Sequence, residues 1–254
     1  MLRISLKIIL FSLILVITTQ AQATKFGFGC LGLVGGFAGY EVKNYDASVL
    51  NQYVSAFNDI RKDSLLSSMN DFGSLKGFRL GMNLVRNRIS GLEYTLKVFY
   101  ETLNEVKEAQ IKGQSGIYTN SLELKQNVFG AGLELGTPLS SIISWKILEV
   151  EFSYGTAQFF RKSEDINNPA TRVKYTVDNY SAGFNLASGF IFFLIDNNIS
   201  LEGKMGYSQF SIGKMHDEDG NILTIAENSS VVPDKIVSKG GLFYGVQFNL
   251  SIPL

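Results

Sequence analysis

Cysteine and histidine are almost absent from this chain: each occurs once among its 254 residues. The lone cysteine, Cys30, cannot form an internal disulfide, and one Cys with one His cannot assemble a zinc site. Lys and Arg total 23, and Asp and Glu also total 23. The chain therefore has no basic excess with which to neutralise nucleic-acid phosphates. We expect no metal, no cofactor and no nucleic-acid partner.

Long apolar runs are also missing beyond the first residues. The best candidates, 182–195 and 26–40, are short and are interrupted by polar residues or glycine, whereas a membrane-spanning helix needs about 20 apolar residues. Proline is scarce, with 4 residues, while the chain has 25 glycines and 12% aromatics. This composition favours many strands joined by tight turns over a helical bundle.

The N-terminus carries the features of an export signal. Arg3 and Lys7 precede the apolar run 8–17, and Ala21-Gln22-Ala23 supplies the small residues of a cleavage site. We predict a signal peptide over 1–23 that is cleaved after Ala23, which leaves 24–254 as the mature domain of an exported protein.

Strict alternation of large apolar and small or polar residues marks the C-terminal segment, as in a strand whose two faces meet different surroundings. About ten residues is also the length with which a tilted strand crosses a bilayer. The residues predicted to face lipid are Leu242, Tyr244, Val246, Phe248, Leu250 and Ile252.

The same alternation recurs in segments that start near residues 78, 92, 148, 180 and 199, and no charge interrupts their apolar faces. The charges on the opposite faces are predicted to line a lumen: Arg79, Glu93, Lys97, Glu149, Glu151, Glu202 and Lys204. Side chains fill the interior of an eight-stranded barrel, and an unpaired buried charge is costly. We therefore expect a paired structural network and no conduction path.

Long and short connections alternate along the chain. The long ones are 41–74, 102–118, 162–171 and 214–239, and the short ones are 86–89, 137–144 and 196–198. Porin-like outer-membrane barrels have short periplasmic turns, longer external loops and an even number of strands. The pattern predicts an all-β fold, an eight-stranded antiparallel up-and-down transmembrane β-barrel.

The leader, the glycine- and aromatic-rich segment 26–40, the alternating strands and the closing segment 248–254 together resemble the outer-membrane β-barrel domain family of Bacteroidota, which includes OmpX-like and PorT-like barrels. The resemblance covers the mature chain and rests on pattern. Many members end in an aromatic residue, whereas this chain ends in Pro253-Leu254. The family implies a location in the bacterial outer membrane and no single activity.

Three segments depart from the simple alternation. In 121–135 the apolar phase changes, and a bulge near Lys125–Val128 would reconcile its two halves. The facing of 26–40 stays open because glycine suits either side. Apolar residues at helical spacing predict a helix over 46–69, capped by Asp46, that folds over the barrel mouth or acts as a plug or partner-binding element.

Two motifs have simpler explanations than a binding or catalytic site. Segment 27–32 matches G-x-G-x-x-G but lacks the strand–helix context of a dinucleotide site. The single histidine, His216, lies in an acidic run without a fixed neighbour and is expected to be an exposed loop residue. No catalytic residue is predicted.

The sequence thus predicts a non-enzymatic, integral outer-membrane barrel. Its partners would be the lipid bilayer, the barrel-assembly machinery during biogenesis and envelope proteins that bind loops 41–74 and 214–239. Three alternatives remain: an accessory component of a secretion or gliding apparatus, a soluble lipocalin-like binder of small molecules, and an outer-membrane enzyme that acts on lipid or protein.

Overall fold

A computed structural model describes residues 35–89, 91–113, 116–165, 168–195, 198–227 and 229–251. The predicted signal peptide over 1–23, the glycine motif 27–32, Cys30 and Ile252 lie outside these ranges.

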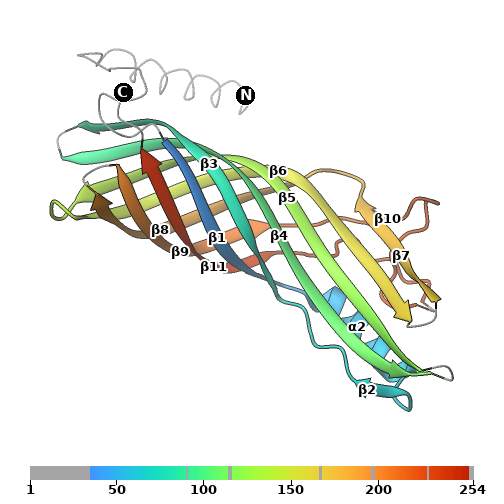
Figure 1. Ribbon diagram of the computed structural model, residues 1–254. Helices are drawn as coiled ribbons and strands as arrows, with labels where there is room; N and C mark the ends of the chain where they lie inside the picture. Colours follow the sequence, from blue (N-terminus) through green and yellow to red (C-terminus); the bar gives the residue numbers. More distant parts are fainter. Residues whose placement is uncertain are drawn as a thin grey trace, which may run out of the picture.

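Eight antiparallel strands form a closed ring (Figure 1). They are β1 (Gly35–Tyr45), β3 (Ser74–Ile89), β4 (Leu92–Lys112), β5 (Ile117–Pro138), β6 (Ile143–Asp165), β8 (Ser181–Ile195), β9 (Ile199–Phe210) and β11 (Gly240–Ser251). Each pairs with the next, and β11 pairs with β1. The predicted eight-stranded up-and-down barrel is confirmed.

Strands β4, β5 and β6 are 21, 22 and 23 residues long and extend well past the rest of the ring (Figure 1). Two further strands pair with these extensions, β2 (Leu65–Ser67) with β4 and β7 (Asn168–Val177) with β6, and β10 (Met215–His216) pairs with β7. The predicted long loops 102–118 and 162–171 are therefore wrong. Their outward residues are polar, which made extended strands look like loops.

The helix in the structure is shorter than the predicted one, which spans 46–69. Helix α2 (Ser48–Ile60) ends well before Met69, and β2 follows it. Ala47 occupies the N-cap position, while the Asp46 carboxylate accepts a hydrogen bond from the Ser48 backbone N–H at 3.1 Å. No helix in the described ranges combines the length and apolar character needed to cross a bilayer.

The two ends of the barrel face their surroundings in opposite ways. One end, which we call the charged end, contains the part of β4 from Leu92 to about Tyr100. There the side chains inside the barrel are largely charged or polar, and those on the outside are apolar. At the helix-bearing end, the inner residues are apolar: Leu103, Leu122, Leu124 and Phe159 are buried and pack with α2 in one core. The outer residues there, such as Asn104, are polar and exposed.

This inversion replaces the bulge predicted near Lys125–Val128. The β4–β5 pairing runs from Glu93↔Gly136 to Lys112↔Ile117 without a register shift. Leu124 and Phe129 thus point to opposite faces of an unbroken strand, one buried and the other 69% exposed. The apolar phase changes because the environment of the strand changes and not because the strand is interrupted.

The C-terminal strand β11 has its large apolar residues on the outside. The five that the structure describes are 45–65% exposed: Leu242, Tyr244, Val246, Phe248 and Leu250. Gln247 and Asn249, on the other face, are buried. On β1, whose facing the sequence left open, Phe37 points inward and Tyr40 outward.

Glycine is needed at Gly130 on β5, where the inward ring of its cross-strand partner Phe99 on β4 lies against it. A Cβ built on Gly130 would lie 2.2 Å from Cζ of Phe99 and 2.6 Å from the backbone oxygen of Phe152. We expect Gly130→Ala to lower the free energy of unfolding by about 1–3 kcal/mol through overpacking. Denaturant titration measures this loss. Gly203→Ala is the matched control, since no atom lies within 4 Å of its added Cβ, and equal losses in both variants would contradict the overpacking.

Candidate functional site

The charged end of the lumen is the first candidate site. The structure brings all seven predicted lumen residues inside, each at most 7% exposed: Arg79, Glu93, Lys97, Glu149, Glu151, Glu202 and Lys204. Glu93 contacts Arg86 and Ser144. The other six belong to one connected network of ion pairs and hydrogen bonds to which every strand of the ring contributes a side chain.

Lys146, on β6, lies at the centre of one half of this network. Its Nζ contacts carboxylate oxygens of Glu134 and Glu149 at 3.0 Å each, and it also contacts Glu202. Those three carboxylates lie within 4.8 Å of one another and could hold a metal ion by their spacing alone. The Lys146 ammonium supplies the positive charge there, and Lys97 adds a second at 2.6–2.7 Å from Glu134 and Glu149.

Arg79, on β3, organises the other half. Its guanidinium donates to Glu41 at 2.9 Å and to both carboxylate oxygens of Glu151, and it stacks 3.6 Å from the ring centroid of Phe99. Lys204 joins the same two carboxylates, at 2.7 Å from Glu41 and 3.3 Å from Glu151. Each buried charge in this half has an opposite charge within contact distance, as burial requires.

Sequence reasoning missed several members of the network. The sequence pattern predicts a loop from Glu41 onward, whereas β1 continues to Tyr45 and carries Glu41 and Lys43 into the lumen. Glu134 alternates with Leu133 and Leu135 and could have been found from that phase. Lys146 could not, because it and Glu149 share a face only through an irregularity in the β6–β8 pairing between them.

The helix-bearing end is closed by a second polar cluster. The Glu227 carboxylate accepts hydrogen bonds from Arg61 at 2.6 Å, from Arg161 at 2.9 Å and from the Tyr53 hydroxyl at 3.5 Å. These contacts tie the segment 211–239 to α2 and to β6. Burial of the Tyr53 hydroxyl raises its pKa above the ordinary value, so it remains a donor to Glu227.

Removal of the Glu227 carboxylate should loosen that segment. We expect Glu227→Ala to increase subtilisin cleavage within 211–239 about ten-fold, because a lost charge-assisted hydrogen bond costs about 1.5–3 kcal/mol locally. Mass spectrometry of the fragments measures the rate. Asp234→Ala serves as the control, because this carboxylate is 95% exposed and, among the residues that the structure describes, pairs only with Lys214. Equal cleavage of the two variants would show that Glu227 does not hold the segment.

His216 is not the isolated loop residue that the sequence suggested. It lies on β10, and its Nδ1 contacts an oxygen of Asp178, which sits in the break between strands β7 and β8. The two residues are 38 positions apart, so no local pattern could have paired them. Within the described ranges, no hydroxyl or thiol hydrogen-bonds to His216.

A belt of outward aromatic rings separates the two ends of the barrel. Two cross-strand contacts and one contact with the residue that precedes β8 build it: Tyr40 with Phe78 at 5.5 Å, Tyr100 with Phe129 at 4.8 Å, and Tyr154 with Tyr180 at 4.9 Å between ring centroids. We call these six residues the aromatic belt. It lies where the outer surface changes from apolar to polar.

No family model matches the chain, and no curated protein matches its sequence. Three solved structures show a distant likeness. Ail, the attachment invasion locus protein of Yersinia pestis, solved with the heparin analogue sucrose octasulfate, has 9% identity and a TM-score of 0.35 over 85% of this chain and 97% of its own. Neisserial surface protein A (NspA) has 15% identity and a TM-score of 0.38 over 87% of this chain and 97% of its own. The outer membrane protease OmpT from Escherichia coli has 9% identity and a TM-score of 0.33 over 85% of this chain and 91% of its own. Likenesses this low assign no function to the chain.

Proposed function

We propose that this protein is an integral β-barrel of a bacterial outer membrane, non-enzymatic, with a closed lumen and an external lobe that performs recognition. The observation that carries the proposal is the apolar outer face at the charged end. There the structure has exposed Leu, Phe, Val and Met residues on the outside and buried ion pairs inside, the reverse of a soluble barrel. Only an apolar solvent makes this arrangement stable.

The height of the apolar face supports a bilayer. On β6 it runs from Trp145, which is 39% exposed, to Tyr154 of the aromatic belt. At about 3.4 Å per residue and a tilt of about 40°, this stretch spans roughly 20–25 Å along the barrel axis. That height agrees with the apolar band of about 25 Å in outer-membrane barrels, and aromatic side chains border such bands.

The closed lumen argues against a porin. Arg79, Lys97 and Lys146 each have at most 1% exposure, so water does not reach the middle of the barrel along a continuous path. Beyond them, α2 and the core around Leu124 fill the helix-bearing end. We infer that the network replaces the apolar core of a soluble barrel and does not conduct ions.

Recognition then falls to the helix-bearing end, which carries the long connections and therefore faces outward from the cell. The predicted loop 41–74 is largely α2, β2 and the end of β1, and 214–239 is held to them by Glu227. This lobe is a structured surface suited to envelope or external partners. The pair His216–Asp178 lies on it, and we assign it no catalytic role, because no hydroxyl or thiol of the described residues hydrogen-bonds to His216.

Three measurements test the proposal. The mature chain, 24–254, should resist extraction from membranes by carbonate and require detergent, whereas a lipocalin-like protein would be released. Folded in detergent, it should run faster on gels before boiling than after. In planar bilayers it should produce no conductance steps. Release by carbonate would overturn membrane integration, and regular conductance steps would overturn the closed lumen.

A further inference from the structure

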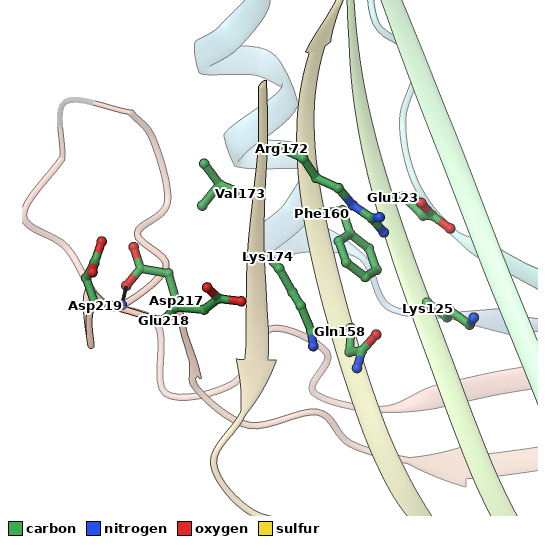
Figure 2. A pocket seen from close by; sticks show the side chains of 10 residues that line it. All are labelled: Glu123, Lys125, Gln158, Phe160, Arg172, Val173, Lys174, Asp217, Glu218 and Asp219. Carbon is green, nitrogen blue, oxygen red and sulfur yellow. Dashed lines mark hydrogen bonds between the residues drawn. The ribbon is translucent and has the colours of Figure 1, made fainter. Parts of the chain in front are cut away.

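A groove of about 610 Å³ lies on the outer wall of β5, β6 and β7, on the polar side of the aromatic belt (Figure 2). Lys125 from β5, Gln158 from β6 and Lys174 from β7 face it. In Figure 2 the Lys174 side chain extends toward Gln158, and Lys125 lies on the far side of Gln158. Lys125 and Gln158 are direct cross-strand partners. Three donor groups thus lie in a row across three strands.

Four carboxylates line the same groove, those of Glu123, Asp217, Glu218 and Asp219, and two of them have partners of their own. Glu123 pairs with Lys162 at 2.9 Å, and the Asp217 carboxylate accepts hydrogen bonds from the backbone N–H groups of Asp219 and Asn221. Glu218 and Asp219 lie on the hairpin beyond β7, on the opposite side of the Lys174 ammonium from Gln158 (Figure 2). Within the described part of the chain, neither Lys125 nor Lys174 has a carboxylate within ion-pair distance.

Directly below the row, the outer wall becomes apolar. A second groove of about 610 Å³ lies between Tyr100, Phe129, Tyr154 and Tyr180 of the aromatic belt. The paired residues Asn127 and Thr156 line this second groove and lie between the belt residues Phe129 and Tyr154 and the donors Lys125 and Gln158 on the same outer face. Lys125 lies four residues beyond Phe129, which is about 13 Å along the strand. At a tilt of about 40° this places it in the headgroup layer above the belt.

We propose that these two grooves bind one phosphorylated lipid of the outer leaflet, with its acyl chain against the aromatic belt and its phosphate against Lys125, Gln158 and Lys174. This inference rests on the proposed membrane location. Two ammonium groups and an amide donor suit a phosphate with more than one negative charge, and the apolar groove beside them selects a lipid over a free anion. Arg172, stacked 4.0 Å from the Phe160 ring centroid, adds positive charge at the upper rim.

The test uses the mature chain in detergent micelles, with native mass spectrometry to measure lipid affinity. The probes are phosphatidic acid, phosphatidylcholine with the same acyl chains, and inorganic phosphate. We expect phosphatidic acid to bind more tightly than phosphatidylcholine. The double variant Lys125→Gln/Lys174→Gln should weaken phosphatidic acid roughly 30-fold, because each lysine near an anionic lipid contributes about a factor of five.

A matched control, Lys62→Gln/Lys112→Gln, removes the same charge from exposed sites away from the groove and should change the affinity less than two-fold. Tyr154→Ala/Tyr180→Ala should weaken both lipids together. Equal binding of the two lipids, an unchanged affinity in Lys125→Gln/Lys174→Gln, or displacement of the lipid by equimolar inorganic phosphate would each overturn the proposal. The gel mobility of each unboiled variant shows whether the barrel has folded, independently of its lipid affinity. Failure of the lipid site and failure of membrane folding are therefore distinguishable.

Discussion

Replacement of Lys146 by methionine should lower the free energy of unfolding by about 3–5 kcal/mol, because it removes the cation that contacts Glu202 and one of the cations that contact Glu134 and Glu149. Lys146 is fully buried, and its ammonium contacts Glu134, Glu149 and Glu202. Methionine keeps most of the side-chain volume and removes only the charge. Denaturant titration of the barrel folded in lipid vesicles measures the loss.

Lys112→Met makes the same chemical change at an exposed position on β4 and should be nearly neutral. Addition of Glu202→Gln to Lys146→Met should recover part of the loss, since Lys146 is the cation that contacts Glu202 in the described part of the chain and one uncompensated negative charge is then removed. A cost below about 1 kcal/mol for Lys146→Met would mean that water solvates these carboxylates. The lumen would then be open, and the inference of a closed barrel would fail.

The second large effect is expected on the outer wall. Leu96 lies on β4 between Tyr94 and Tyr100 and is 41% exposed, near the middle of the proposed membrane band. Leu96→Arg should destabilise the barrel in lipid by about 2–4 kcal/mol, the cost of arginine on the lipid face at midplane. The fraction that runs as the unboiled folded band after refolding into vesicles measures it.

Asn104→Arg is the control on the same strand and the same outer face, eight residues beyond Leu96 and past the aromatic belt. It should fold as well as the wild type. If both arginines are tolerated equally, the apolar wall does not face lipid, and the membrane location proposed for this chain is incorrect.

The ring of strands could be predicted because the two faces of each strand at the charged end of the barrel have different surroundings. Where the outside is apolar and the inside charged, the alternation is strong, as on β11 around Val246 and Gln247. That contrast is enough to predict both the number of strands and the inward facing of the lumen charges. The glycine-rich start of β1 has no such contrast, so its alternation does not reveal which side faces the lumen.

The helix-bearing end was harder to predict for a physical reason. There the outer face is polar and the inner face apolar, and Leu122 and Leu124 pack against α2, a partner that sequence periodicity does not reveal. The outward Asn104 and Glu108 then resembled a loop. Contacts that join distant segments, such as His216 with Asp178 or Glu227 with Arg161, depend on three-dimensional placement alone.

The uninterrupted β4–β5 pairing has a consequence for how faithfully the barrel assembles. Its 20 consecutive residue pairs couple the two oppositely faced ends rigidly. If β5 slipped by one residue, Glu134 would turn into the proposed bilayer and Leu124 into water at the same moment, since a one-residue shift reverses every side chain. A shifted register is thus destabilised twice, by a charged side chain in an apolar surrounding and by an apolar side chain in water. Each half of the β4–β5 pairing therefore helps to fix the register of the other half.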